Sequence, residues 1–523
     1  MSDTEQSSQI DHLAHLFVLI HGLWGSANHM ITIERMVNDL LPGCTSDKIV
    51  CLRPSSFSFW RTYDGLKINS DRVISEIYYE IETLKQTQNL KVDKISIVGY
   101  SLGGLIARHV IGSLYELGFF DVVSPVFFTT FATPHVGVEF YRKNIFDYVS
   151  NNFGRFLFGK SGLELFVGDD DKLLLQMSDP SKPYFKGLAK FQRHMLLANV
   201  KNDRTVAFFT SYITEYSPFE KWSSVKIKYI KNLPQAKIGK AVVRPKFVDL
   251  TRSQYLSKDE VKSFKGNVQE QTSFFRTNPV LKFVMLVLIA CFFLPVWIPL
   301  VLTTTFWVSI YSMLKVRVIA AVEIADHWKK VKNTVYGGLP VDISDVMIGK
   351  QKRDQRRRLS RQESFKGDTS QLTRQTVEMI MYEEERLTNG SAKEVFSDAD
   401  DDTDRTESES ELEETIQTKI GIINVKRNDK IVESALDLMK IKDHESFPLF
   451  TPETKLELDD DKSQIVANLN KLDWIKIPVY IDAWNSHDGI VARRGPKTNP
   501  KGTSSIGLWC SIMRNHLRSM NES

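Results

Sequence analysis

Residues 94–117 read KISIVGYSLGGLIARHVIGSLYEL, and this stretch decides how the rest of the sequence is interpreted. The run KISIVG is short, apolar and rich in β-branched residues, which is typical of a buried strand. The run LGGLIARHVIGSL that follows is typical of a helix. Between them, residues 99–103 form a G-x-S-x-G motif on a sharp strand-to-helix turn. We expect Ser101 at the carboxyl end of the strand, and glycine at Gly99 and Gly103 because side chains there would collide with neighbouring backbone.

The chain around this motif alternates between apolar strands and helices, which is typical of βαβ units. The sequence therefore predicts an α/β fold, with a mostly parallel sheet and helices on both faces. The last strand follows a long insertion, and we expect it to return to the first sheet. The expected strands are 16–20, 48–52, 94–99, 126–131, 196–200 and 475–482, and the expected helices are 28–40, a long one capped by Asn69 or Ser70, 102–117 and 460–472.

The overall composition excludes several classes of protein. Of the 523 residues, 42% are apolar and 25% are charged, which rules out a wholly disordered or fibrous chain. The 68 basic and 64 acidic side chains leave a net charge of +4, which is too small to indicate a nucleic-acid binder. The four cysteines include no C-x-x-C pair, so neither a disulfide scaffold nor a zinc site is expected. No cofactor or metal is expected, and the polar N-terminus lacks the features of a signal peptide.

One segment differs sharply from this average composition. Residues 283–314 contain no charged side chain, and the run is long enough to enter a membrane. Pro295 and Pro299 near its middle disfavour a straight helix. The two arms, 283–294 and 300–314, would be about 18 and 22 Å long as helices, which is short for roughly 30 Å of hydrocarbon. The sequence therefore predicts a hairpin that enters and leaves a lipid layer on the same side.

The regions beyond this run differ in composition and divide the chain. Residues 352–361 hold six basic side chains and residues 398–414 hold ten acidic ones, which is typical of a disordered linker. The stretch 322–336, with Trp328 among lysines, fits an interfacial helix or a solvated one equally well. The expected organisation is a disordered N-terminus (1–14), the first part of the α/β core (15–255) with a candidate cap (140–191), a membrane-associated insert (256–345), a disordered charged linker (346–415), an irregular insert (416–459), the last part of the core with a histidine loop (460–495) and a C-terminal tail (496–523).

A serine hydroxyl is a weak nucleophile unless a histidine takes its proton and an acid orients that histidine. After a G-x-S-x-G turn of this kind, the acid comes first along the chain and the histidine second. His487 lies in the loop just beyond the last expected strand, and we predict that it is the general base. Asp203 follows the strand 196–200 and is the expected acid. The triplet at 169–171 is its competitor, although it follows no strand and resembles a solvated loop.

Acyl transfer at such a serine also requires two backbone N–H donors for the oxyanion. One is expected from Leu102, which directly follows the nucleophile. The other is expected from the loop HGLWG at residues 21–25, where Gly22 lets the backbone approach the serine. Leu23 N–H is our choice for this second donor, and Trp24 N–H is the alternative.

Several of these segments together resemble one protein family. The similar segments are LFVLIHGLWGS, KISIVGYSLGGLIAR, FATPHVGV, NVKNDRTVAFFT and VYIDAWNSHDGIVARR, within residues 15–215 and 460–495. They resemble the "putative serine esterase" family of eukaryotic α/β-hydrolases, and within it the fungal branch that contains a lipid-droplet phospholipase. The resemblance implies a serine carboxylic-ester hydrolase, a lipase or phospholipase, and it supports Ser101, Asp203 and His487 position by position. His135, in the shared FATPHVGV segment, is interpreted as a structural or pocket-lining residue and not as the base.

Together these features predict a phospholipase that acts at the lipid droplet surface through an acyl-enzyme on Ser101. Because Asp203 precedes residues 283–314 and His487 follows them, a single membrane crossing would separate the triad. A hairpin with basic flanks keeps the catalytic domain cytosolic, and it fits the droplet monolayer or the endoplasmic reticulum membrane. The expected partners are a glycerolipid substrate and this lipid layer. The alternatives are a monoacylglycerol or neutral-ester lipase and, from another class, an inactive lipid-droplet scaffold.

Overall fold

The structure is a computed structural model of the 523-residue chain, which forms two compact units. The first unit comprises residues 1–256, 307–336 and 406–523, and every element named below belongs to it. The second unit is described only at residues 257, 303 and 337. In total, the structure describes residues 12–139, 141, 151, 158–231, 233, 236–238, 241–257, 303, 307, 310, 324–337, 413–417, 422–426, 435–439, 446–483 and 485–522.

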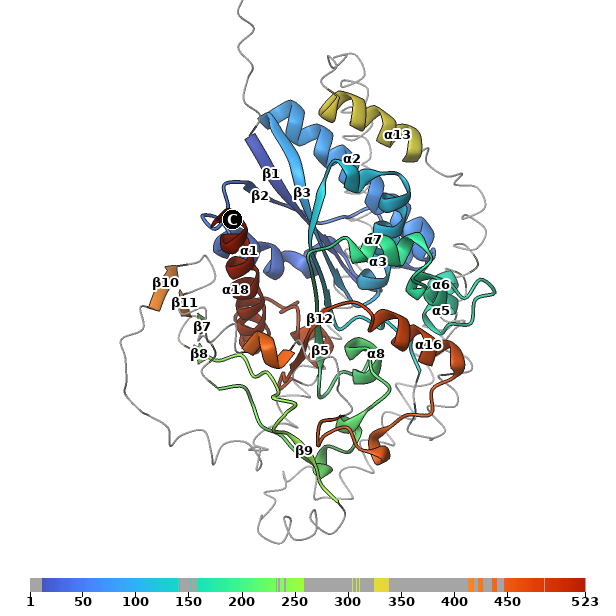
Figure 1. The fold of residues 1–523 in the computed structure, drawn as a ribbon, viewed down its shortest axis with the longest axis vertical. Helices are drawn as coiled ribbons and strands as arrows, with labels where there is room; N and C mark the ends of the chain where they lie inside the picture. The colour runs from blue at the N-terminus through green and yellow to red at the C-terminus, as the bar shows by residue number, and fades with distance from the viewer. Residues whose placement is uncertain are drawn as a thin grey trace, which may run out of the picture. The chain divides into compact units, whose positions relative to one another are not determined.

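A six-stranded parallel sheet forms the centre of the first unit (Figure 1). The strand order is β12-β5-β4-β3-β1-β2, and every neighbouring pair is parallel. The chain leaves β1 toward one edge and then crosses back to β3, so the connections diverge at the β1–β3 pair. Sheets of this kind bind ligands at the carboxyl ends of the strands beside such a switch point. The strands are β1 (His12–Ile20), β2 (Lys48–Leu52), β3 (Leu90–Tyr100), β4 (Ser124–Phe131), β5 (Arg193–Asn199) and β12 (Trp474–Val479).

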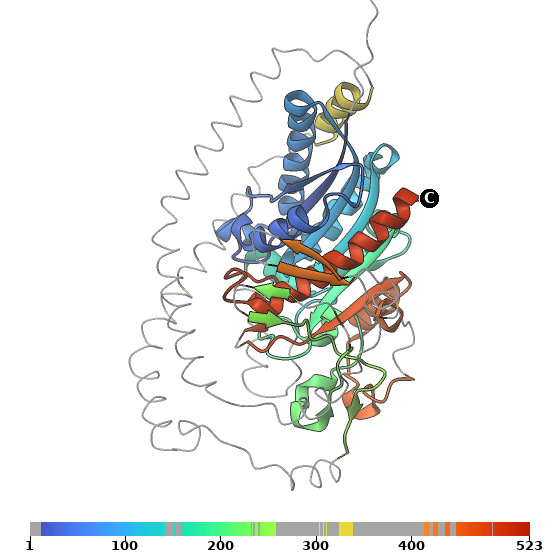
Figure 2. The ribbon, with the colours of Figure 1, turned by 90° about the vertical axis from the view of Figure 1, so that its left-hand side faces the viewer.

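Helices cover both faces of the sheet, as Figures 1 and 2 show. Successive side chains of a strand point to opposite faces, so Val18 of β1 belongs to one buried cluster and Phe17 to the other. This arrangement confirms the predicted α/β class, and β12 does return to the first sheet beside β5. The first face is covered by α2 (Leu66–Gln88), α3 (Leu102–Glu116), α6 (Leu173–Ser178), α7 (Pro183–Ala189), α8 (Phe208–Tyr212) and α16 (Asp460–Leu469), and the second by α1 (Ile31–Leu40) and α18 (Pro500–Glu522).

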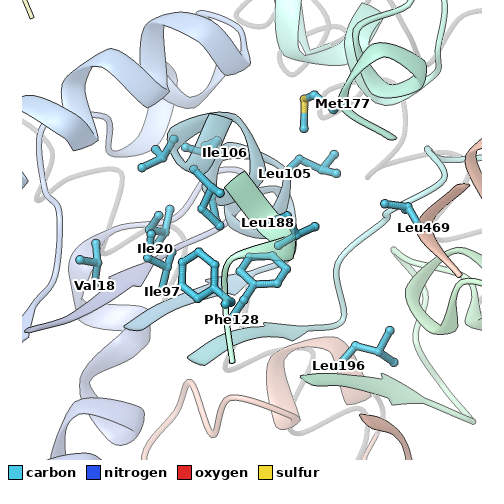
Figure 3. Close-up of a cluster of buried hydrophobic side chains, with 14 of the residues drawn as sticks. Val18, Ile20, Ile97, Leu105, Ile106, Phe128, Met177, Leu188, Leu196 and Leu469 are labelled. Carbon is cyan, nitrogen blue, oxygen red and sulfur yellow. The ribbon is translucent and has the colours of Figure 1, made fainter. Parts of the chain in front are cut away.

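Figure 3 shows part of the cluster on the first face, where side chains from the strands of the sheet meet side chains from the helices. Val18, Ile97 and Phe128 come from adjacent strands, and Leu105 of α3 and Leu188 of α7 pack over them. All five side chains are fully buried, and burial of such a side chain stabilises a fold by about 1.5–3 kcal/mol. This cluster fixes α3, and with it the turn that carries Ser101, against the sheet.

The start of the long helix was predicted wrongly. α2 begins at Leu66 rather than at a cap formed by Asn69 or Ser70. Gly65 precedes it with φ of 95°, a conformation that favours glycine. Asn69 lies buried inside the helix, where its Nδ2 donates to the Thr62 carbonyl at 3.3 Å. The polar residues that resembled a cap therefore serve a tertiary contact.

The C-terminal residues 496–523, expected as a tail, instead contain the 23-residue helix α18. Trp509 is fully buried, and its Nε1 donates to Thr129 Oγ1 of β4 at 3.1 Å. Its ring also meets Phe131 edge-on, with the centroids 5.3 Å apart. The apolar spacing of this segment was the signal for a packed helix, and its buried members are Ile506, Trp509, Cys510, Met513 and Leu517.

The insert at 416–459, expected to be irregular, contains regular structure. Its strand β11 joins a four-stranded antiparallel sheet in the order β10-β11-β7-β8, to which residues 236–243 contribute β7 and β8. Residues 435–439 are helical.

The remaining strands and short helices of the first unit are β6 (Val225–Lys226), β7 (Ala236–Ile238), β8 (Ala241–Val243), β9 (Gln254–Tyr255), β10 (Glu413–Gln417), β11 (Ile422–Lys426), α5 (Gly159–Leu165), α17 (Ser486–Gly489), η1 (Ala27–Met30), η2 (Phe59–Tyr63), η3 (Phe119–Asp121), η4 (Pro218–Ser224) and η8 (Pro452–Thr454).

The helix α13 (Ile324–Val331) follows the apolar run in sequence and packs against α2. Trp328 is 3% exposed and stacks on Tyr78 of α2 with the ring centroids 5.4 Å apart. After a π-helical turn, η6 (Lys332–Tyr336), the Tyr336 hydroxyl donates to the Val92 carbonyl at 2.7 Å. Since the protein itself covers Trp328, the interpretation of this stretch as an interfacial helix is wrong.

The predicted hairpin at 283–314 lies outside the described residues except at 303, 307 and 310. The predicted linker at 346–415 is likewise outside them except for its last three residues. Among the residues that the structure does describe, no helix is long and apolar enough to cross a membrane.

Candidate active site

Ser101 lies at the turn between β3 and α3, at the carboxyl end of the sheet. Its backbone has φ of 54° and ψ of −129°, a conformation that residues with a side chain rarely adopt. Two hydrogen bonds hold it there: its N–H donates to the Phe131 carbonyl at 2.9 Å, and its carbonyl accepts from Gly104 N–H at 3.0 Å. The hydroxyl is thereby fixed at the N-terminus of α3, where the helix dipole favours negative charge.

Three glycines permit the close packing around this turn. A Cβ on Gly99 would lie 2.3 Å from Gly104 Cα, and one on Gly103 would lie 2.3 Å from the Ile20 carbonyl oxygen. A Cβ on Gly22 would lie 2.7 Å from Ser101 Cβ. All three distances are too short for any side chain. The backbone of the loop after β1 therefore approaches the serine directly.

The structure brings the three residues of the predicted triad together. His487 Nε2 lies 3.0 Å from Ser101 Oγ, and His487 Nδ1 lies 3.0 Å from Asp203 Oδ2. Ser101 follows β3, Asp203 follows β5, and His487 lies in α17 after β12. Because these strands are parallel, their carboxyl ends deliver all three side chains to one edge of the sheet. This explains how residues separated by 386 and 284 positions in sequence meet.

The surroundings of Asp203 keep its carboxylate ionised and oriented. Oδ1 accepts the N–H groups of Thr205 at 3.0 Å and Val206 at 2.8 Å, and Oδ2 accepts Asn199 Nδ2 at 2.8 Å as well as His487. Burial alone would raise the pKa of Asp203, but the charge and hydrogen bond of His487, with the Val206 and Asn199 donors, outweigh it and lower the pKa.

His487 is held as a base with a raised pKa. Burial alone would lower its pKa, but the charge and hydrogen bond of Asp203 and the charge of Asp488 outweigh burial and raise it. The loop that carries His487 is tied to the acid loop, since Ser486 Oγ donates to the Lys201 carbonyl at 2.6 Å. In addition, the Tyr100 hydroxyl donates to the His487 carbonyl at 3.0 Å.

Comparison with known proteins finds a family model that matches the region holding Ser101 and Asp203. Residues 11–214 match the family described as "Putative serine esterase". The match includes Ser101 and Asp203, whereas His487 lies beyond its end. We call residues 11–214 the serine esterase region after the family model that they match. The third residue of the triad comes from a segment that returns to the sheet after the insertions.

The relatives of the serine esterase region include yeast proteins. The chain is 30% identical over 208 residues to "Putative lipase C4A8.10" of Schizosaccharomyces pombe. The aligned stretch covers 38% of this chain and 26% of that protein. It is 30% identical over 207 residues to "Putative lipase ROG1" of Saccharomyces cerevisiae. This aligned stretch covers 38% of this chain and 28% of that protein. The chain thus spans only about a quarter of the length of these relatives.

Solved structures with some similarity include fungal esterases from Rhizomucor miehei. Their TM-score is 0.21 at 14% identity, with 37% of this chain and 58% of that chain covered. An "Alpha/beta hydrolase fold protein from Nakamurella multipartita" has a TM-score of 0.20 at 9% identity, with 38% of this chain and 79% of that chain covered.

Asp488, next to His487 in sequence, and Asp169 of the competing triplet each have partners of their own. Asp488 Oδ1 accepts from the Tyr100 hydroxyl at 3.3 Å and from Arg493 at 2.7 Å. Asp169 Oδ2 accepts the Leu173 N–H at 2.8 Å at the start of α6.

Two histidines of the serine esterase region are buried outside the triad. His21 stacks on Phe57 with ring centroids 4.1 Å apart, and burial lowers the pKa of His21 to about 4. His135 Nε2 lies 2.9 Å from Thr130 Oγ1, and burial lowers the pKa of His135 well below its usual value. Both histidines therefore stay neutral at physiological pH and serve as structural groups.

The loop after β1 distinguishes between the two candidate oxyanion donors. Trp24 N–H is already engaged, because it donates to Thr62 Oγ1 at 3.2 Å. In the part of the chain that the structure describes, no acceptor takes the Leu23 N–H. The Leu102 N–H lies in the first turn of α3, where N–H groups lack acceptors within the helix. Leu23 and Leu102 therefore fit the two donor positions better than Trp24 does.

Sequence reasoning missed the groups that support the triad. Asn199, Ser486 and Tyr100 each bond to a triad residue or its loop, yet none belongs to a motif that predicts such a role. Tyr100 was inside the G-x-S-x-G motif, and its place beside the serine was the only available signal.

Other features of the described residues lie apart from this site. No group of three or more His, Cys, Asp or Glu side chains among them is arranged to hold a metal ion. A cavity of about 440 Å³ lies at the amino ends of β5 and β12, where Arg193, His194 and Trp474 line it. Since Ser101 is at the carboxyl edge of the sheet, this cavity is remote from the triad.

Proposed function

We propose that this protein is a serine carboxylic-ester hydrolase that cleaves acyl esters of glycerolipids. The observation that carries the proposal is the continuous hydrogen-bonded chain from Ser101 Oγ through His487 to Asp203, with both links 3.0 Å long. A structural role for these groups would require neither the strained Ser101 backbone nor glycine at three crowded positions around it. The yeast relatives, named as lipases, support the lipid substrate.

The first half of the proposed reaction forms an acyl-enzyme. His487 Nε2 takes the Ser101 proton while Oγ attacks the ester carbonyl carbon, so a C–O bond forms and the carbonyl oxygen becomes an oxyanion. Leu23 N–H and Leu102 N–H stabilise this oxyanion. The imidazolium, stabilised by the Asp203 carboxylate, then donates its proton to the departing lyso-lipid or glycerol oxygen as the ester C–O bond breaks.

The second half returns the enzyme to its starting state. His487 removes a proton from a water molecule, whose oxygen attacks the acyl carbon on Ser101. Collapse of the second oxyanion breaks the acyl–Oγ bond, and His487 returns the proton to Oγ. The fatty acid leaves with one oxygen from water, and no other reactant is consumed.

We further propose that the substrate is a phospholipid at a lipid droplet surface, which the apolar segment 283–314 holds in reach. The segments before and after it, ending at Leu256 and starting at Ile324, both pack within the unit that holds the triad. A segment between two such anchor points that enters a lipid layer must return to the same side. That behaviour suits a droplet monolayer, which has no second aqueous face, and a cytosolic catalytic domain.

The test uses the full chain and two serine variants. We would incubate wild type, Ser101→Ala and the matched control Ser124→Ala with mixed micelles of phospholipid, lysophospholipid and monoacylglycerol, and measure released fatty acid. Ser124 is exposed at the start of β4 and lies outside the site. We expect release from phospholipid that is lost in Ser101→Ala and kept in Ser124→Ala.

The other outcomes distinguish the alternative functions. Release from monoacylglycerol alone would replace the phospholipase by a neutral-ester lipase with the same triad. Absence of any serine-dependent release, combined with altered cellular lipid turnover when residues 283–314 are deleted, would favour the catalytically inactive scaffold. A variant lacking 283–314 that still reaches droplets would refute the proposed anchoring.

A further inference from the structure

A short helix next to the active site is bonded directly to the loop that carries Leu23. Trp24 N–H donates to Thr62 Oγ1 at 3.2 Å, and Trp24 Nε1–H donates to the Tyr63 hydroxyl. The Phe59 N–H donates to the Gly25 carbonyl at 2.9 Å. Both ends of η2 are thus joined to the two residues that follow Leu23.

These bonds hold backbone that would not keep its shape alone. Trp24 has φ of 52° and Phe59 has φ of 54°, which is unfavourable for any residue with a Cβ. Such conformations persist only where their surroundings fix them. On its other side the loop is fixed by Gly22, whose Cα approaches Ser101 too closely for a Cβ. The peptide that presents Leu23 N–H therefore lies between two fixed points, and one of them is η2.

The helix η2 is itself held by a segment that the mechanism does not use. Ser161 of α5 donates through Oγ to the Thr62 carbonyl at 2.6 Å and accepts the Gly65 N–H at 3.0 Å. Glu164 Oε2 accepts the Leu66 N–H at 2.7 Å, at the start of α2. Thr62 and Ser161 are fully buried, and Glu164 is 2% exposed. A continuous buried path therefore runs from α5 through Thr62 to Trp24.

We propose that Thr62 and Tyr63 are positioning residues that set the Leu23 N–H of the oxyanion hole, and that α5 acts on this donor through Ser161 and Thr62. The inference rests on the proposed function, because it assigns these residues to the same ester hydrolysis. It also gives α5, which lies within the candidate cap at 140–191, a specific role. A displacement of α5 would loosen the Trp24 backbone and weaken transition-state stabilisation without touching the triad.

The first test replaces Thr62 with residues of nearly equal size. Thr62→Val removes the oxygen that accepts Trp24 N–H, Thr62→Ser retains it, and Thr87→Val at an exposed site of α2 is the control. With a soluble short-chain ester, we expect kcat of Thr62→Val to fall about 10-fold or more with KM little changed, because an oxyanion donor acts on the transition state. Thr62→Ser and Thr87→Val should remain within about 2-fold of wild type, a range well below one oxyanion donor's effect.

A transition-state analogue separates positioning from general damage. An alkylboronic acid forms a tetrahedral adduct on the serine and places an oxygen in the oxyanion hole. Its inhibition constant for Thr62→Val should therefore rise by the same factor by which kcat falls. If Thr62→Val folds poorly, Tyr63→Phe removes the acceptor of the Trp24 indole while keeping the ring, and should show the same split between kcat and KM. If these variants keep the kcat and the boronate affinity of the wild-type protein, the inference is overturned.

The second test is a double-mutant cycle between α5 and η2. Ser161→Ala should lower kcat in the wild-type background and have little further effect in Thr62→Val, because the two residues act along one path. Additive effects would overturn the role of α5. A wild-type protein that hydrolyses no ester would refute the proposed function itself, and the inference would fall with it. If the wild-type protein hydrolyses esters and the variants keep its kcat, the inference is refuted and the proposed function stands.

Discussion

Replacement of Asp203 by asparagine tests the triad most sharply, because the structure specifies what an amide would do there. Asp203 Oδ1 accepts two backbone N–H groups, while Oδ2 accepts from Asn199 and His487. An amide has only one oxygen. If that oxygen takes the Oδ1 position, its NH₂ faces His487 Nδ1, which must then accept rather than donate. The proton moves to Nε2, and His487 can no longer take the Ser101 proton.

The magnitude of this effect follows from the loss of the correct tautomer. An equivalent change in another serine hydrolase lowers kcat by about 10⁴-fold, or about 5.5 kcal/mol of activation free energy. We expect Asp203→Asn to lose activity on that scale in an initial-rate assay with a soluble ester. Loss of a charge-assisted hydrogen bond should also lower the unfolding free energy by about 1.5–3 kcal/mol, measured by denaturant titration.

The matched control is Asp169→Asn, the competing acid at the start of α6. It should keep wild-type kcat, since its Oδ2 bonds only to the local Leu173 N–H in the described contacts. Asp203→Asn with activity within 10-fold of wild type, or Asp169→Asn with a loss of about 10⁴-fold, would refute the assignment of the acid.

Three further outcomes follow from the structure. The pKa of His487 is raised above its usual 6.5, and only the neutral imidazole accepts a proton, so kcat should rise with pH through a midpoint above 6.5. Because the charge of Asp488 contributes to this raised pKa, Asp488→Asn should move the midpoint of the pH–rate profile to lower pH. An unmoved midpoint would contradict the role of Asp488. Gly22→Ala should lower kcat by about 100-fold or more, because the added Cβ would collide with Ser101. If an organophosphonate labels Ser101 of this variant at the wild-type rate, the collision does not impair the nucleophile. Trp509→Ala should cost about 3–5 kcal/mol of unfolding free energy in urea, and a change under 1 kcal/mol would show that α18 is dispensable.

The sequence predicted the features that depend on local pattern. The alternation of strands and helices gave the α/β class, and the G-x-S-x-G turn between a strand and a helix singled out Ser101. His487 was found because a catalytic loop in such a sheet follows a strand, so chain position alone removed most other histidines. The first two inferences use information within a few residues of the group concerned, whereas the assignment of His487 also uses the order of the acid and the histidine along the chain.

The contributions from distant residues could not be predicted in the same way. Asn199 supports Asp203 only because the strand end turns its amide toward the carboxylate. Asn69 resembled a helix cap, yet the tertiary bond to Thr62 places it inside α2. The lysines around Trp328 suggested a solvated or interfacial helix, whereas contact with Tyr78 buries the indole. Partners remote in sequence decide each of these cases.

The position of β12 at the sheet edge has a consequence for the order of events during synthesis. A nascent chain that has reached residue 214 already contains Ser101 and Asp203 but has no complete triad, because β12 has not yet docked beside β5 to deliver His487. Residues 283–314 leave the ribosome before that histidine. At 5–20 residues per second the interval is roughly 10–35 s. Any contact of the apolar run with lipid therefore precedes assembly of the triad.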